Sequence, residues 1–248
     1  AISLGVGEPD FITPWTIREA GIYSLEKGQT YYTANAGLME LRQEICKYMM
    51  RKYSVSYDAK KEVLVTVGGS EAIDLMIRCV VNPGDEVLIP EPSFVCYKPC
   101  TIMAGGIPVA IETKEEDDFR LLPEQLKAAI TEKTKLLILP YPNNPTGGVM
   151  SRAVLEAIAK VLEGTDILVL SDEIYGELRY GEEGHTPFSA IEGMWERTVV
   201  VNGFSKAFAM TGWRLGYAVG PAPIIQAMTK VHHSAGTPRP GTTDCAAA

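Results

Sequence analysis

The stretch NGFSKAFAMTGWRLGY, residues 202–217, carries the strongest signal in the sequence. It places Lys206 and Arg214 among small and apolar residues, and the nearest acidic residue upstream is Glu196. A solvent-exposed helix face normally mixes basic and acidic side chains, so this pattern is not that of a surface helix. The stretch therefore predicts that its two cations bind an anion that the chain itself does not supply.

Short apolar runs, rich in β-branched residues, flank this stretch and recur along the chain with helical patterns between them. We expect strands at 62–67, 86–90, 107–111, 135–140, 166–171, 198–202 and 215–220. This alternation predicts an α/β fold with a mostly parallel sheet of about seven strands. Several runs are apolar at every position, as expected of strands that are covered by helices on both faces.

Three segments between these runs have the apolar spacing of amphipathic helices. Their apolar stripes run through residues 38–49, 73–80 and 154–162, and we expect them to form the core. The sequence shows no internal repeat, low-complexity tract or clear linker. These features favour one domain with an N-terminal segment in front of it.

The composition is typical of a globular protein that binds a small molecule. The chain has 248 residues, 46% of them hydrophobic, a formal net charge of −8 and a pI near 5.0. No basic block offsets the repulsion from phosphate, which argues against nucleic acid or an acidic membrane as a partner. No apolar run approaches the ~18 residues of a membrane span, and no charged and apolar leader opens the chain.

The cysteines suggest a reducing compartment, and we expect a cytoplasmic protein. They are odd in number and scattered, at positions 46, 79, 96, 100 and 245, so they do not form a disulfide framework. Cys96 and Cys100 are the one close pair. Because the three histidines are remote from this pair in sequence, we expect no metal site.

The first expected strand is followed by an anion-binding pattern. Ligands of open α/β sheets bind outside the carboxyl ends of the strands. Gly68 and Gly69 end the strand and Ser70 opens a helix, so the N–H groups of Gly69, Ser70 and Glu71 would point at an anion. The GxGxxG and GxxxxGK[ST] frames are absent. The alternative is that Ser70 is a plain N-cap.

Two further loops place polar side chains at the same edge of the sheet. In PNNPTGG, residues 142–148, Asn143 and Asn144 could merely stabilise a turn. In SDEIY, residues 171–175, Asp172 follows a buried strand, where a carboxylate is costly unless something pairs with it. A cationic ligand atom is one such partner, and a helix-capping or ion-paired Asp172 is the alternative.

Several of these motifs together resemble a known family. They are NNPTG at 143–147, SDEIY at 171–175 and GFSKAFAMTGWRLG at 203–216, with GEPDF at 7–11 and YYTANAGLMELR at 31–42. They resemble the class I aminotransferases, which are pyridoxal 5′-phosphate enzymes of fold type I, close to the aspartate and aromatic aminotransferase branch. The resemblance covers almost the whole chain.

The resemblance implies roles for the charged residues. Lys206 would form the Schiff base with the cofactor aldehyde and later move a proton as the catalytic base. Asp172 would pair with the pyridine nitrogen and keep it protonated, so that the ring accepts electrons. Arg214 would bind the cofactor phosphate. The N–H groups of Gly69, Ser70 and Glu71 would bind the same phosphate.

The resemblance also implies roles for aromatic and backbone groups. Tyr175 and Asn144 would hydrogen-bond the phenolic oxygen of the cofactor, and Phe94 would stack on its ring. Tyr32 would reach across the interface of a homodimer to the partner's phosphate, so that two subunits share each active site. The alternative is that Tyr32 is a surface aromatic beside Tyr31. Gly7 would place a backbone donor near the substrate carboxylate.

The sequence departs from the family pattern in two places. The family often has a phosphate-binding serine three residues before the lysine, where this chain has Gly203, which leaves that role to Ser205 or to no residue. The chain also stops before the C-terminal small domain, which carries the arginine that binds the substrate carboxylate, and Arg239 lies too early to be that arginine. We expect residues 1–30 to be an N-terminal segment on the substrate side and residues 31–248 to be the large cofactor-binding domain.

The function implied is transfer of an amino group between an amino acid, of aspartate or aromatic type, and a 2-oxo acid. Other fold type I enzymes, such as carbon–sulfur β-lyases, use the same cofactor residues, because only the substrate pocket decides which bond breaks. A pyridoxal-phosphate-sensing domain of a transcription regulator is a second alternative. An inactive fragment is a third.

Overall fold

The computed structural model describes residues 7–178, 180–181, 184–234 and 241–248, the last segment without the side chains of 241–243. Its α-helices are α1 (Trp15–Glu26), α2 (Met39–Tyr53), α3 (Gly69–Val80), α4 (Tyr97–Met103), α5 (Pro123–Ala129), α6 (Arg152–Leu162), α7 (Ala222–Ser234) and α8 (Gly241–Ala247). Its strands are β1 (Val63–Thr66), β2 (Glu86–Glu91), β3 (Ile107–Glu112), β4 (Thr134–Leu139), β5 (Leu168–Asp172), β6 (Thr198–Gly203) and β7 (Gly216–Val219).

The seven strands form one sheet in the order β1-β7-β6-β5-β4-β2-β3. The pairs among β2, β3, β4, β5 and β6 are parallel, whereas β7 is antiparallel to both β6 and β1. Because β7 is antiparallel to both of its neighbours, β1 runs in the same direction as β6. The expected mostly parallel sheet of about seven strands is confirmed, and the carboxyl ends of six strands meet at one edge.

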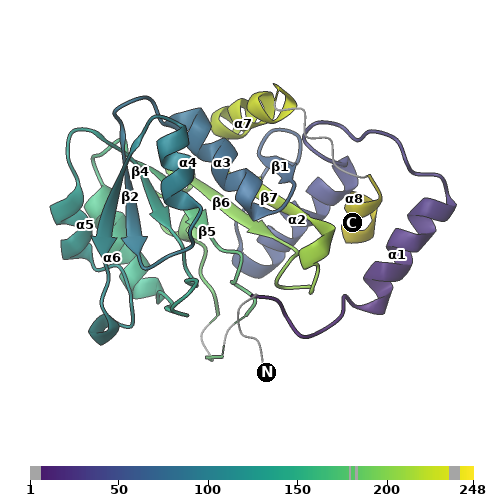
Figure 1. Ribbon diagram of the computed structural model, residues 1–248, viewed down its shortest axis with the longest axis horizontal. Coiled ribbons are helices and arrows are strands. Elements are labelled where there is room, and N and C mark those ends of the chain that lie inside the picture. The colour runs from purple at the N-terminus through teal and green to yellow at the C-terminus, as the bar shows by residue number, and fades with distance from the viewer. Residues whose placement is uncertain (1–6, 179, 182–183, 235–240) are drawn as a thin grey trace.

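Helices cover both faces of the sheet, as expected from its continuous apolar strands. On one face, α3, α4 and α7 form one hydrophobic core that includes Leu136 and Ile138 of β4 (Figure 1). On the other face, α5 and α6 pack against Leu137 and Leu139 of the same strand. The helix α2 covers that second face at the other end of the sheet, over β1, β6 and β7. Successive residues of a strand thus point into opposite cores.

The three predicted helical stripes lie in α2, α3 and α6, and each faces the core. The sequence did not predict α4, which begins directly after the second loop. Pro99 lies in the first turn of α4, where a missing N–H removes no helical hydrogen bond, so this proline does not interrupt the helix. The N-terminal helix α1 lies apart from the sheet and packs against α8 (Figure 1).

A close contact between two glycines brings the start of α3 against β7. A Cβ atom on Gly216 would lie 2.5 Å from the carbonyl carbon of Gly68 and 2.6 Å from the nitrogen of Gly69. Only a residue without a side chain allows the two backbones to approach this closely. The contact holds the first turn of α3 beside the strand that follows Arg214.

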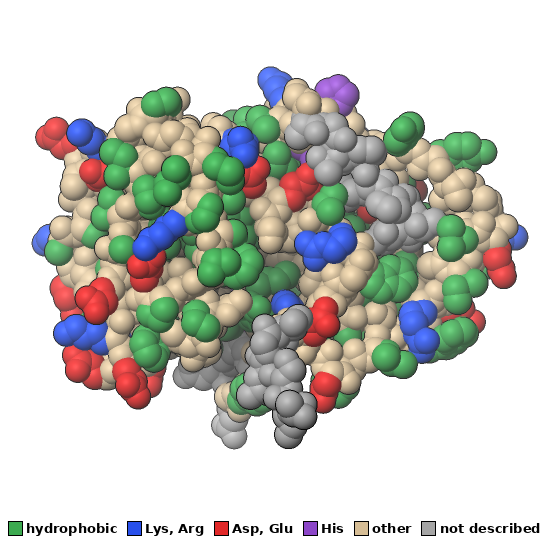
Figure 2. Space-filling model, viewed as in Figure 1, with side chains coloured by type: hydrophobic (Ala, Val, Ile, Leu, Met, Phe, Trp, Pro, Cys, Tyr) green, Lys and Arg blue, Asp and Glu red, His purple; other side chains and the backbone are tan. Residues whose placement is uncertain are grey.

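The described surface is mixed in charge. On the face in Figure 2, lysine and arginine side chains lie singly among acidic and hydrophobic ones. Within the described residues, no helix is both long and apolar enough to cross a membrane.

Candidate active site

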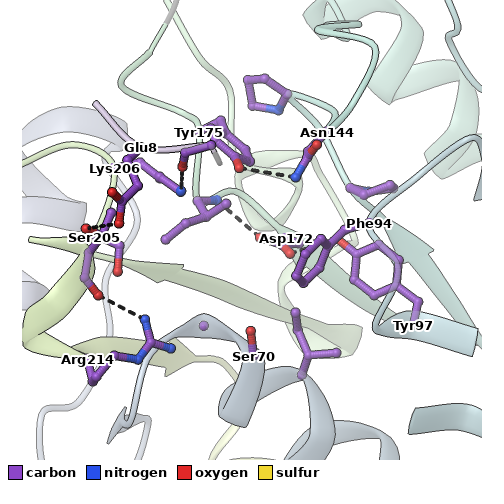
Figure 3. A pocket seen from close by; sticks show the side chains of 17 residues that line it. Glu8, Ser70, Phe94, Tyr97, Asn144, Asp172, Tyr175, Ser205, Lys206 and Arg214 are labelled. Carbon is purple, nitrogen blue, oxygen red and sulfur yellow. Dashed lines mark hydrogen bonds between the residues drawn. The ribbon is translucent and has the colours of Figure 1, made fainter. Parts of the chain in front are cut away.

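The carboxyl ends of the strands surround a cavity of about 390 Å³. Residues that the sequence singled out line it from separate loops: Gly7, Gly69, Ser70, Phe94, Asn144, Asp172, Tyr175, Ser205, Lys206 and Arg214. Lys206 and Arg214 lie on one side of the cavity and Asp172, Phe94 and Asn144 on the other (Figure 3). The topology brings them together because β1, β4, β5 and β6 all end at this edge.

Lys206 extends into the cavity from the loop after β6. Its Nζ donates a hydrogen bond to the carbonyl oxygen of Gly7 and lies 5.7 Å from the centre of the Tyr175 ring. Burial lowers the pKa of Lys206, and the positive charge of Arg214 lowers it further. Both effects increase the fraction of the neutral, nucleophilic amine.

The chain also supplies a carboxylate here, which corrects the expectation that the cations face no acid of the chain. Glu8 lines the cavity and raises the pKa of Lys206, against the effects of burial and Arg214. Its Oε1 accepts a hydrogen bond from Thr211 Oγ1 at 3.0 Å. The carbonyl oxygen of Thr211 accepts a hydrogen bond from Arg214 Nη1 at 3.1 Å, so Glu8 is linked to both cations.

Asp172 ends β5 and is buried at the cavity, with 7% of its surface exposed. Its Oδ2 accepts a hydrogen bond from the Tyr97 hydroxyl at 2.8 Å, and its Oδ1 accepts one from the backbone N–H of Ile174 at 3.2 Å. Burial raises the pKa of Asp172 to about 6, although both hydrogen bonds act in the opposite direction. Asp172 neither caps a helix nor forms an ion pair with a described residue.

The two asparagines of the turn at 142–148 have different tasks. Asn143 stabilises the turn, because its Oδ1 accepts hydrogen bonds from the N–H and hydroxyl of Thr146. Asn144 instead donates from Nδ2 to the Tyr175 hydroxyl at 3.3 Å. Burial and the charge of Asp172 raise the pKa of Tyr175, so its hydroxyl stays protonated.

The first turn of α3 and Arg214 form the cationic end of the cavity. Gly68 precedes the helix with a positive φ of 77°, and a Cβ there would lie 2.5 Å from Nη2 of Arg214. Ser70 is inside the helix and does not cap it, so the N-cap alternative is wrong. The Glu71 side chain accepts from the Val67 N–H at 2.5 Å, and Glu71 does not line the cavity, whereas Gly69 and Ser70 do.

Comparison with known proteins identifies the family of this chain. The family described as "Aminotransferase class I and II" matches residues 1–248. The chain belongs to this family. It is 53% identical to YugH of Bacillus subtilis (strain 168) over 94% of this chain and 60% of that protein. It is 46% identical to the aspartate aminotransferase of Pyrococcus abyssi (strain GE5 / Orsay) over 92% of this chain and 59% of that protein.

The solved structures agree with this aminotransferase assignment. The aromatic aminotransferase from Pyrococcus horikoshii OT3 superposes with a TM-score of 0.95 at 44% identity, over 99% of this chain and 66% of that one. The expected family and fold are therefore confirmed, and pyridoxal 5′-phosphate is the cofactor of this family. The chain spans less than two thirds of the length of the curated relatives named above.

The remaining residues that the sequence singled out differ in their position relative to the cavity. Tyr32 is 87% exposed and does not line the cavity, as both its interfacial and its plain surface interpretation require. Gly203 lies at the end of β6, whereas Ser205 lines the cavity. Arg239 lies outside the described residues.

All five cysteines are free. The described residues contain no group of three or more histidine, cysteine, aspartate or glutamate side chains that could hold a metal ion.

Sequence reasoning missed three polar residues of the cavity: Tyr97, Glu8 and Thr211. Tyr97 opens α4 while Phe94 lies before this helix, so their spacing of three residues gave no helical signal. Glu8 lies in the motif GEPDF, which pointed to the N-terminal segment, but only the fold shows that its side chain reaches Thr211, 203 positions away. Thr211 had no signal of its own.

Proposed function

We propose that the protein transfers an amino group between an amino acid and a 2-oxo acid, with pyridoxal 5′-phosphate bound in the cavity of about 390 Å³. The observation that carries this proposal is that one cavity is lined by Asp172, at the end of β5, and by Lys206 and Arg214, both in the segment between β6 and β7. When bound, the cofactor supplies an aldehyde that takes up amino groups and a protonated ring that accepts electrons.

The residues present fit this cofactor at each of its ends. The buried carboxylate of Asp172 accepts one hydrogen bond at each oxygen and has no basic partner among the described residues, which suits a protonated ring nitrogen. Arg214, Ser70 and the N–H groups of the first turn of α3 suit a phosphate. Gly68 leaves room for the Arg214 side chain, because a Cβ there would collide with it.

The remaining polar groups of the cavity suit the phenolic oxygen of the cofactor. Tyr175 and Asn144 already share a hydrogen bond at 3.3 Å, so their donors lie on one side of the cavity. The ring of Phe94 lines the cavity and offers an aromatic face to a planar ligand.

Lys206 is the group that binds the aldehyde and transfers the proton. Its neutral amine is the nucleophile, and the lowered pKa makes that form more abundant. Once an incoming amino group releases Lys206, its Nζ is free to take a proton from the substrate carbon and return it elsewhere. The Gly7 carbonyl, which accepts from Nζ, orients the amine toward the cavity.

The printed activities of the relatives support an aspartate or aromatic amino acid as substrate. The two named relatives with an assigned substrate are an aspartate and an aromatic aminotransferase. No feature of the described residues favours a carbon–sulfur β-lyase or a cofactor-sensing regulator over this activity.

An assay of the full-length protein tests the proposed reaction. Aspartate or an aromatic amino acid is supplied with 2-oxoglutarate, and formation of glutamate is measured. We expect glutamate only when both substrates are present. Release of ammonia and pyruvate without an acceptor would instead establish a lyase.

We further propose a cytoplasmic homodimer with shared active sites, in which residues 31–248 form the cofactor-binding domain and residues 1–30 serve the substrate side. Gly7 and Glu8 line the cavity, which supports the second part. The exposed Tyr32 is available to a partner's phosphate. Sedimentation tests the dimer, and Tyr32→Phe should weaken cofactor binding in the dimer, whereas Tyr31→Phe, also at an exposed tyrosine, should not.

A further inference from the structure

Tyr97 is a buried tyrosine in the lining of the cavity that none of the roles above uses. It opens α4, and only 2% of its surface is exposed. Its hydroxyl donates to Oδ2 of Asp172 at 2.8 Å (Figure 3). Its ring meets the ring of Phe94 edge to face, with centroids 6.0 Å apart and an interplanar angle of 81°. One residue thus contacts both the carboxylate and the aromatic ring that are assigned to the cofactor.

The direction of this hydrogen bond is fixed by chemistry. Burial, together with the charge of Asp172, raises the pKa of Tyr97 well above its ordinary value, so the hydroxyl remains protonated. An ionised carboxylate can only accept, and Tyr97 is therefore the donor. The other oxygen of Asp172 accepts from the Ile174 N–H, so both oxygens are held and the carboxylate plane is fixed.

We propose that Tyr97 is a positioning residue for the cofactor, whose hydroxyl holds Asp172 ionised and oriented toward the ring nitrogen while its ring supports Phe94 from behind. This inference rests on the proposed function, because it needs the cofactor nitrogen to face Asp172. It adds a residue to the machinery that acts through Asp172 and touches no substrate.

Other titratable groups also face Asp172. They are Cys96, directly before α4, and Tyr97, at its start, Glu173 and Tyr175 from the segment after β5, and Lys206 and Arg214 from across the cavity. Contact with the Cys100 thiol and burial raise the pKa of Cys96, so it stays neutral. Burial and the charge of Glu173 raise the pKa of Asp172. The hydrogen bond from Tyr97 lowers this pKa and so favours the ionised carboxylate.

The variant Tyr97→Phe removes the donor and keeps the ring. Tyr57→Phe is the matched control, because Tyr57 is also buried and donates to Ser189 Oγ at 3.0 Å, away from the cavity. The measurement is the affinity for pyridoxal 5′-phosphate as a function of pH. Protonation of Asp172 abolishes its pairing with the ring nitrogen, so the affinity falls on acidification.

We expect this fall in affinity to begin at higher pH in Tyr97→Phe, by about one pH unit, because loss of a charge-assisted hydrogen bond favours the protonated carboxyl. Near neutral pH the affinity should then drop by up to about tenfold. Tyr57→Phe should keep the wild-type midpoint. A wild-type midpoint in Tyr97→Phe would overturn the proposal.

Two further measurements distinguish a failure of the Tyr97 proposal from a failure of the proposed function. Asp172→Asn should remove the pH step altogether, and if it keeps the wild-type step, the pairing of Asp172 with the cofactor is wrong and so is the proposed function. The stability of the cofactor-free Tyr97→Phe protein is the second measurement. We expect a loss relative to wild type that is largest at alkaline pH and shrinks on acidification, whereas an equal loss at every pH would show a packing role only.

Discussion

The guanidinium of Arg214 packs directly over Gly68, so that a Cβ at position 68 would lie 2.5 Å from Nη2. Both residues have left-handed backbones, with φ of 77° at Gly68 and 55° at Arg214. This pair places a permanent cation beside the first turn of α3, whose residues Gly69 and Ser70 line the same cavity. The cation and the helix terminus thus form one anion site from two loops that are far apart in sequence.

The variant Gly68→Ala should weaken cofactor binding by displacing Arg214. Loss of charge-assisted hydrogen bonds of about 1.5–3 kcal/mol predicts a roughly tenfold to hundredfold lower affinity for pyridoxal 5′-phosphate. Gly28→Ala is the matched control, because Gly28 also has a positive φ, of 69°, but no atom would lie within 4 Å of its Cβ. Affinity for pyridoxal, which lacks the phosphate, should change much less. Equal effects of the two variants on cofactor binding would contradict the account.

Ser205, and not position 203, should supply the phosphate-binding hydroxyl of the loop. A Cβ on Gly203 would lie 3.0 Å from both the Gly216 Cα and the Leu215 carbonyl oxygen. We therefore expect Gly203→Ser to lower the free energy of unfolding without raising cofactor affinity. Ser205→Ala should lower the affinity by about 0.5–1.5 kcal/mol, the usual size for one hydrogen bond. Titration calorimetry checks both, and tighter binding by Gly203→Ser would refute this division of roles.

Asp172 should make the cofactor-free protein less stable as pH rises. Its pKa is about 6 in the folded protein and ordinarily 3.8, so between these values the folded chain holds a proton that the unfolded chain has lost. The unfolding free energy thus falls as pH rises through this window, by about 3 kcal/mol in total. Relative to Asp172→Asn, the wild type should lose this amount between pH ~4 and ~7.

Denaturant unfolding of both proteins across the pH range measures this difference. The variant Asp166→Asn, at an exposed position just before β5, serves as the control for effects that do not come from the cavity. If the difference in unfolding free energy between wild type and Asp172→Asn does not change with pH, burial does not raise the pKa of Asp172 in the folded protein.

Glu8 should control the pH at which Lys206 reacts. The charge of Glu8 raises the pKa of Lys206, so Glu8→Gln should lower that pKa and expose the neutral amine at lower pH. The pH midpoint for the rate of covalent cofactor attachment should shift downward. Glu19→Gln, at an exposed position on α1, should leave the midpoint in place. An upward shift in Glu8→Gln would be inconsistent with the observed placement of Glu8.

Much of this site could be predicted because its residues lie at or just after the carboxyl ends of strands, which the apolar runs mark in the sequence. Asp172 and Lys206 follow the apolar runs of β5 and β6, and parallel neighbours must end at the same edge. The reversal of β7 could not be read in this way, since its apolar run resembles those of the parallel strands. The direction of a strand depends on its partners and not on its own residues.

The missed residues depend on contacts that local patterns do not encode. Tyr97 reaches Asp172 because α4 starts at Tyr97 and turns its first residue inward, and Pro99 concealed that helix. Glu8 reaches Thr211 because the N-terminal segment crosses the cavity, a contact over most of the chain length. Both contacts join separate elements, so their geometry follows from tertiary packing.

Covalent attachment of the cofactor to Lys206 is the most direct test of the account. The purified protein is mixed with pyridoxal 5′-phosphate, its visible spectrum is recorded, and borohydride is added before peptide mass analysis, with Lys206→Ala in parallel. We predict a visible band that borohydride removes and a cofactor mass on the peptide containing Lys206, with neither in the variant. A band and a cofactor mass that persist in Lys206→Ala would contradict the central claim.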